Sequence, residues 1–153
     1  MKKLILLCVT ALCITTMARS QAAMYFELGG PGVASFNFDT RFTGRSDGIG
    51  GRIGVGGFSI NDEGAIFVPV GLNYLIGKET KHFFEVGAGF TYVNYSSVVL
   101  DDGIFETSFG HLSFGYRMQP QKNGFLFRAA IVPVFNKYGF LPYYAGVSFG
   151  YKF

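Results

Sequence analysis

The residues best suited to chemistry lie at positions 109–113, where His111 and Ser113 are two residues apart. On an extended strand they share one face, and a histidine can activate a serine hydroxyl as the nucleophile of ester hydrolysis. The nearest carboxylate, Glu106, has the opposite parity and points to the other face of a regular strand. We therefore keep ester hydrolysis as an alternative and expect no catalytic residue.

Other site chemistry has little support in the sequence. The chain has two histidines, His82 and His111, and two cysteines, Cys8 and Cys13. Both cysteines lie in the N-terminal segment, and neither follows the small residue expected at a lipoprotein site. The glycine-rich stretches lack the Lys-Ser/Thr pair of a P-loop, and no G-x-G-x-x-G opens a helix. We expect no metal and no cofactor.

The N-terminus has the pattern of a secretory signal peptide. Two lysines precede an apolar run at residues 4–16, which is too short to span a membrane as a helix. Small residues follow, so we expect cleavage after Ala22, with cleavage after Ser20 as the alternative. Residues 1–22 are then the signal peptide and residues 23–153 the single mature domain. Its ten basic residues balance ten acidic ones, which gives no argument for nucleic-acid binding.

The mature chain alternates between apolar and small or polar residues. At positions 35–42, three phenylalanines share one parity and Ser35, Asn37, Asp39 and Arg41 share the other, which predicts a β-strand. The pattern recurs at residues 66–76, 84–92, 112–116 and 143–153, and more weakly at 24–30, 51–58 and 125–135. The parity of Arg128 in the last of these stays open. Seven glycine- and asparagine-rich turns separate these eight strands; they are expected at 30–32, 45–48, 61–64, 77–80, 101–103, 121–124 and 137–139.

The composition of the polar face indicates which side of the sheet is inside. A face in contact with water should be rich in Lys and Glu, whereas this one carries many glycines and few charges. Glycine relieves crowding in the narrow interior of an eight-stranded barrel. We predict an all-β, eight-stranded, antiparallel up-and-down transmembrane barrel with the aromatic face toward lipid. The expected lumen network is Glu27, Asp39, Arg41, Arg52, Asn73, Glu85, Arg117, Arg128 and Lys152. The outward tyrosines expected to form interfacial girdles are Tyr25, Tyr74, Tyr92, Tyr116, Tyr143 and Tyr151.

The last residues, with Phe149, Tyr151 and Phe153 at every second position, resemble the C-terminal strand of bacterial outer-membrane β-barrels. The resemblance implies that this strand is read by the barrel-assembly machinery. The stretches YFELGGPG, GLNYLIGK, FFEVGAGFTY, GYRMQP and GFLFRAAIVPVF look like the small outer-membrane barrels of Bacteroidetes. That similarity implies an outer-membrane location, membrane lipid as the surrounding partner, a monomer, and no assigned reaction.

Four alternatives accompany this interpretation. The H-x-S spacing resembles outer-membrane lipid A deacylases, but Phe114 stands where that family has an asparagine. A narrow pore is the second alternative, and a surface-interaction barrel, with its longest loop at residues 96–103, is the third. The fourth is a soluble, lipocalin-like barrel whose aromatic face lies inside.

Overall fold

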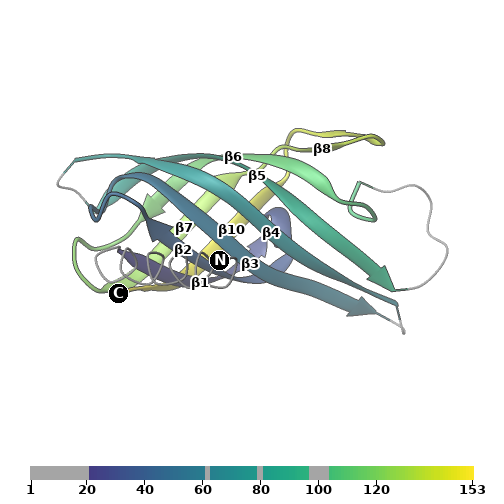
Figure 1. Ribbon diagram of the computed structural model, residues 1–153, viewed down its shortest axis with the longest axis horizontal. Helices are drawn as coiled ribbons and strands as arrows, with labels where there is room; N and C mark the ends of the chain where they lie inside the picture. The colour runs from purple at the N-terminus through teal and green to yellow at the C-terminus, as the bar shows by residue number, and fades with distance from the viewer. Residues whose placement is uncertain (1–20, 61–62, 79–80, 97–103) are drawn as a thin grey trace, which may run out of the picture.

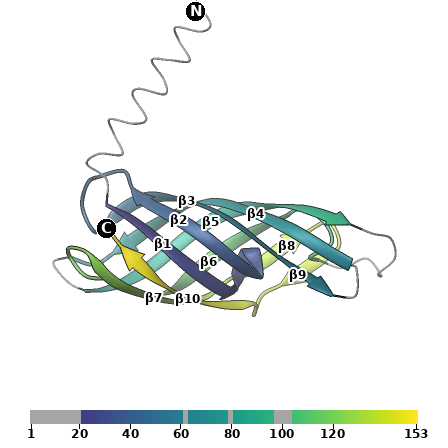
Figure 2. The ribbon, with the colours of Figure 1, turned by 90° about the horizontal axis from the view of Figure 1, so that it is seen from below.

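The computed structural model describes residues 21–60, 63–78, 81–96 and 104–153, which form a closed antiparallel β-barrel (Figures 1 and 2). Each barrel strand pairs with its neighbours, and pairing of β1 with β10 and of β5 with β6 completes the ring. The predicted all-β fold with eight barrel strands is confirmed. The barrel strands are β1 (Ala22–Gly29), β2 (Ala34–Arg41), β3 (Gly48–Ile60), β4 (Glu63–Ile76), β5 (His82–Ser96), β6 (Phe109–Met118), β7 (Gly124–Ile131) and β10 (Ala145–Lys152).

The two ends of the barrel differ. The turn end carries the connections at 42–47 and 119–123, together with the start of β1 and the end of β10. The hairpin end carries the 3₁₀ helix η1 (Gly30–Gly32), residues 104–108 and a small hairpin of β8 (Val134–Asn136) and β9 (Gly139–Leu141). The expected turn at residues 101–103 and most of the expected long loop at 96–103 lie outside the described residues. None of the helices in the described ranges is long and apolar enough to cross a membrane.

The predicted strand at residues 125–135 is wrong in its second half. β7 ends at Ile131, because Pro133 has no N–H to donate to a ladder. The Val132 N–H instead donates to the Tyr144 carbonyl at 2.6 Å. The chain then forms the β8–β9 hairpin, so the expected turn at 137–139 joins these two short strands and does not lead directly into the last barrel strand. Asn136 closes that turn, because its side-chain oxygen accepts the N–H of Tyr138.

The alternation of faces follows the predicted parity. The apolar face points outward, where Phe36, Leu72 and Tyr92 keep 69%, 56% and 57% of their surface exposed. The polar face points inward, and Arg128, whose parity the sequence left open, is fully buried inside. Tyr25 is a correction, because it was expected outward but is only 2% exposed. It shares its parity with Glu27 and therefore points into the barrel.

The interior is not polar throughout, which the sequence analysis did not anticipate. At the hairpin end an apolar cluster fills it, with the Phe67 and Phe109 rings 6.5 Å apart. The helix η1 also folds inward, and the Pro31 carbonyl accepts a hydrogen bond from the Thr91 hydroxyl at 3.1 Å. The glycine immediately before η1 has φ +73°, a conformation that glycine adopts without strain. The cluster is made of Ala65, Phe67, Val93, Phe109, Ala130, Val132 and Val134.

Inward glycines make room for the large charged side chains. In β3, Gly50 faces inward, and a Cβ there would overlap the guanidinium of Arg41 and the backbone of Thr40. The next residue, Gly51, faces outward, and a Cβ there would meet only the tip of the Phe42 ring. The two neighbours therefore form a matched pair for testing the crowded interior.

We predict that Gly50→Ala lowers the free energy of unfolding by about 2–3 kcal/mol, because it displaces the buried Arg41 side chain from its partners. Gly51→Ala should cost less than about 1 kcal/mol, since the Phe42 ring is exposed and can move. Urea-induced unfolding of both variants measures the difference. Equal costs would contradict the inward placement of Gly50.

Candidate functional site

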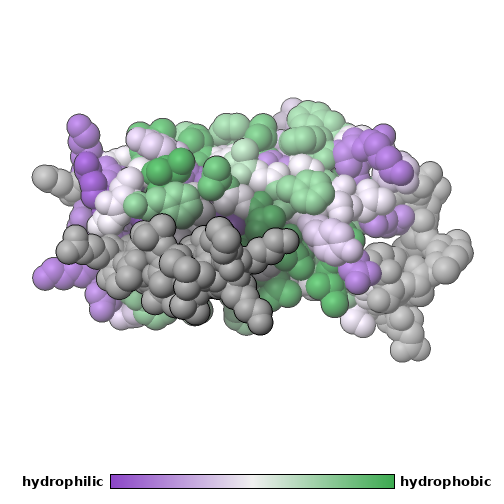
Figure 3. Space-filling model, in the orientation of Figure 1, coloured by the Kyte–Doolittle hydropathy of each residue, from purple (hydrophilic) through white to green (hydrophobic). Residues whose placement is uncertain are grey.

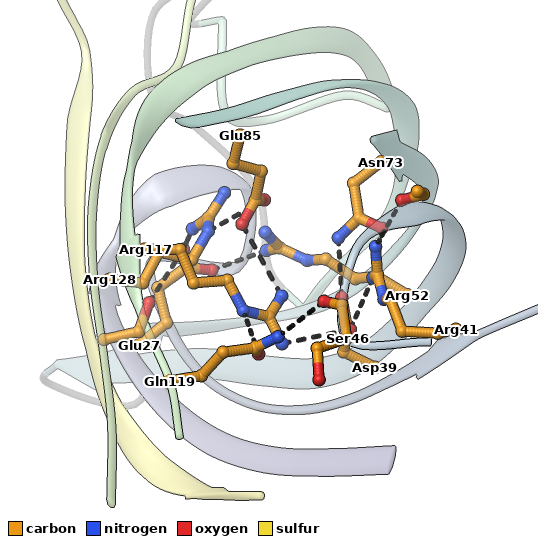
Figure 4. Close-up of polar contacts among 12 residues, drawn as sticks. Glu27, Asp39, Arg41, Ser46, Arg52, Asn73, Glu85, Arg117, Gln119 and Arg128 are labelled. Carbon is orange, nitrogen blue, oxygen red and sulfur yellow. Dashed lines mark hydrogen bonds and ion pairs between the residues drawn. The ribbon is translucent and has the colours of Figure 1, made fainter. Parts of the chain in front are cut away.

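All eight barrel strands contribute polar side chains to one buried network. Figure 4 shows its members from β1 to β7. The structure places every residue of the expected lumen network inside the barrel, each at most 7% exposed. Strands far apart around the ring meet through these side chains, because an eight-stranded barrel is narrow enough for side chains to cross it. The contributors are Glu27 of β1, Asp39 and Arg41 of β2, Arg52 of β3, Asn73 of β4, Glu85 of β5, Arg117 of β6, Arg128 of β7, and Ser148 and Lys152 of β10.

Asp39 is the centre of the half of the network nearest the turn end. Its Oδ1 lies 2.6 Å from Nη2 of Arg41 and 3.2 Å from Nη2 of Arg117. Asn73 binds both members of the first pair: its amide donates to Asp39 Oδ2 at 2.6 Å, and its oxygen accepts from Arg41 Nη2 at 2.5 Å. One carboxylate thus orders two guanidinium groups from different strands.

Glu85 and Glu27 connect the remaining arginines. Glu85 lies between Arg117, at 3.5 Å, and Arg128, at 2.9 Å. Glu27 then lies between Arg128 and Arg52, with both contacts at 2.5 Å. Acids and bases therefore alternate in one continuous chain, which runs from Arg41 through the three carboxylates to Arg52.

Lys152 lies inside the barrel but outside this chain of ion pairs. Its Nζ donates to the hydroxyl of Ser46 at 2.9 Å and to the carbonyls of Pro120 and Gln121 at 2.8 and 3.1 Å. All three acceptors are neutral. Lys152 therefore ties the end of β10 to two connections at the turn end.

Four polar residues of the network were not among those predicted for it, although the alternation of the last strand already placed Ser148 on the inward face. Gln119 accepts from Arg117 Nε at 2.8 Å and donates to the Ser46 carbonyl at 2.9 Å. Ser148 donates to Glu27 at 3.3 Å, and the inward Tyr25 ring lies beside the Arg52 guanidinium at 5.9 Å. Strand parity would have found Gln119, Ser148 and Tyr25. No periodic signal exists for Ser46, because it lies in a turn.

His111 and Ser113 point into the barrel, 4% and 6% exposed. His111 Nδ1 lies 3.4 Å from the Thr91 hydroxyl, which donates in turn to Pro31. No hydrogen bond between His111 and Ser113, and none from a carboxylate to either, is present among the described residues. The described ranges also contain no group of three or more His, Cys, Asp or Glu residues placed to hold a metal.

The three aromatic residues at the end of the chain lie on the outward face. Phe149, Tyr151 and Phe153 are 46%, 49% and 57% exposed. The Tyr151 and Phe153 rings lie 5.6 Å apart, and the Phe153 N–H donates to the Ala22 carbonyl at 2.9 Å. The pairing of β10 with β1 therefore continues to the last residue.

The chain matches no protein-family model, no curated protein and no solved structure. The geometry defines an up-and-down β-barrel with an apolar outer face and an interior crossed by ion pairs.

We predict a strong energetic coupling between Glu27 and Arg52 in a double-mutant cycle. Glu27→Gln should lower the free energy of unfolding by about 3–5 kcal/mol, because it leaves Arg52 and Arg128 buried without their shared carboxylate. The coupling with Arg52→Met should exceed about 1.5 kcal/mol. The exposed pair Arg45–Asp47, at 3.0 Å, is the control and should couple by less than about 1 kcal/mol. Chemical unfolding of the two cycles provides the measurement, and equal couplings would contradict the prediction.

Proposed function

We propose that this protein is a small integral barrel of a bacterial outer membrane, with a lumen closed by its own side chains and a structural, envelope-associated role. One observation carries the proposal: the distribution of polarity is inverted relative to a water-soluble protein. Charged side chains such as Arg128 and Glu27 are fully buried, while large apolar side chains are exposed around the barrel. A lipid environment makes this arrangement favourable, and closure of the sheet satisfies the backbone hydrogen bonds.

The outer surface supports the same proposal. A broad band of hydrophobic residues lies between hydrophilic residues at the two ends (Figure 3). Tyr74, Tyr116 and Tyr151 are exposed on the outward face toward the turn end, and Tyr92 and Tyr143 toward the hairpin end. Tyrosine is favoured at both interfaces of a bilayer, where its ring contacts lipid and its hydroxyl contacts water. A soluble, lipocalin-like barrel would have these rings inside.

The interior supports a closed lumen. The chain of ion pairs crosses the barrel, and beyond it η1 and the apolar cluster occupy the hairpin end. His111 and Ser113 lie within this packed interior, where an acyl chain outside the barrel does not reach them. We therefore prefer a structural role to ester hydrolysis, to a pore, and to a surface-interaction barrel.

We also propose export through the N-terminal signal and insertion by the barrel-assembly machinery. The two cleavage sites differ in what they leave in the barrel. The carbonyl of Gln21 accepts the Arg41 N–H at 3.0 Å, and its side-chain oxygen accepts from the Ser46 hydroxyl at 2.7 Å. Cleavage after Ser20 keeps these contacts, so we prefer it to cleavage after Ala22. The mass of the exported protein distinguishes the two sites.

We predict that Leu72→Arg reduces membrane insertion strongly. Leu72 is exposed on the outward face of β4, and an arginine facing the middle of a bilayer costs about 2–4 kcal/mol. The measurement is fractionation of cell envelopes, with detergent extraction and heat-modifiable gel mobility as signs of a folded membrane barrel. Leu72→Phe is the control and should insert normally. A protein that extracts in buffer alone, with Leu72→Arg as abundant as the wild type, would contradict the membrane proposal.

We predict that the wild-type protein gives no sustained conductance in planar bilayers, because its ion pairs cross the lumen. A variant with Glu85→Ala and Arg128→Ala removes two crossing side chains together and should give measurable open events. Phe149→Ala, on the outward face, is the matched control and should stay closed. Stable open channels of the wild type would support the pore alternative instead.

A further inference from the structure

The buried charges are unevenly divided along the barrel. Glu27 and Glu85 are balanced by Arg128 and Arg52, each within 2.9 Å of a carboxylate. Toward the turn end, Asp39 contacts Arg41 and Arg117, and Arg117 also lies 3.5 Å from Glu85. The third buried cation there, Lys152, has no carboxylate partner among the described residues. The interior therefore carries its excess positive charge at the turn end.

None of the contacts that the described residues make with the Lys152 ammonium group neutralises its charge. Lys152 is 2% exposed, and its three hydrogen bonds end on neutral oxygens. Both terminal nitrogens of Arg41 donate hydrogen bonds, but its buried Nε has no hydrogen-bond partner among the described residues. Buried charge without a counter-charge is costly, so this end of the barrel is electrostatically suited to an anion.

A polar pocket of about 260 Å³ opens at the same end. Ser46 and Gln121 line this pocket, and both also bind Lys152: its Nζ donates to the Ser46 hydroxyl and to the Gln121 carbonyl. Only these two residues therefore separate the pocket from the Lys152 ammonium group. Gln21 and Arg45 also line the pocket and add amide and guanidinium donors.

The donors favour an oxyanion over a halide. The side chain of Arg45 is 68% exposed, so its planar guanidinium group can turn toward a ligand with several oxygens. Phosphate oxygens accept such paired hydrogen bonds from a guanidinium group. Asp47 opposes an anion, since it also lines the pocket and lies 3.0 Å from Arg45. Arg45 would therefore have to give up its ion pair with Asp47 to bind the phosphate oxygens.

We propose that the turn end of the barrel is a binding site for a phosphate-class anion, either free inorganic phosphate or the phosphate of a phospholipid headgroup. Arg45 and the Gln21 and Gln121 amides contact the oxygens, and the positive charge behind Ser46 attracts the anion. The proposal rests on the barrel interior and its pocket. Binding of free phosphate does not depend on the proposed membrane location, whereas binding of a headgroup does.

The experiment measures the thermal unfolding midpoint of the purified protein in neutral detergent as inorganic phosphate is added. A ligand that binds only the folded state raises this midpoint with concentration. We expect phosphate to raise it, and sodium chloride at matched ionic strength to leave it unchanged. No difference between the two salts would overturn the proposal.

Variants locate the site. Arg45→Gln and Lys152→Met should each weaken the phosphate response by about tenfold, because each removes a unit charge close to the anion. Arg45 is exposed, so its variant is informative even if Lys152→Met fails to fold. Asp47→Asn should strengthen the response, and Lys137→Gln, at the hairpin end, should leave it unchanged. Equal responses of the Arg45, Asp47 and Lys137 variants would overturn the proposal.

The source of the phosphate is tested in lipid vesicles. If the site takes a headgroup, vesicles of phosphatidylcholine, alone or with phosphatidylglycerol, should abolish the response to added phosphate, because both lipids carry a headgroup phosphate. If it takes the free ion, the response should persist in both kinds of vesicle. Both outcomes support the site and assign its ligand, whereas no response in either vesicle, with none in detergent, would refute it.

Discussion

The structure depends on neutralising charge inside a closed, narrow barrel. Three carboxylates and four guanidinium groups alternate from Arg41 to Arg52, and each carboxylate contacts two arginines. Removing one member would leave its neighbours buried without a partner, which costs more than the pair itself contributes. Because Asn73 and Ser148 bind the same carboxylates, all eight barrel strands are joined through the interior as well as through their backbones.

The backbone is arranged around these side chains. Glycine occupies inward positions beside the bulkiest groups: Gly50 beside Arg41, Gly30 beside Glu27, and Gly150 beside Tyr25. Gly50 and Gly150 weaken their strands slightly, since glycine has no side chain to pack, whereas Gly30 lies in η1. The space they leave lets long side chains cross a barrel of only eight strands. The glycine-rich composition is therefore a consequence of the interior network.

The two ends of the interior use different chemistry. At the hairpin end, Phe67, Phe109 and the inward-folded η1 exclude water by packing. At the turn end, Lys152, Ser46 and Gln119 connect strands to turns through hydrogen bonds and keep excess positive charge. In the proposed membrane location, the packed end and the polar, cationic end would face opposite sides of the bilayer. That asymmetry is the basis for assigning ligand binding to the turn end alone.

Alternation along the sequence by itself determined the eight strands and the faces of most of them, because a side-chain period of two is a local property of extended backbone. It therefore placed Asp39, Glu85 and Lys152 inside together. It left the face of Arg128 open, and Tyr25 was predicted outward although it points inward. It did not separate residues 125–131 from the β8–β9 hairpin, although Pro133 marks the break. Only the tertiary structure decided that Glu27 pairs with Arg128, 101 positions away, or that the turn residue Ser46 meets Lys152. Those partners depend on strand register and barrel closure, which set distances across the lumen that no local pattern encodes.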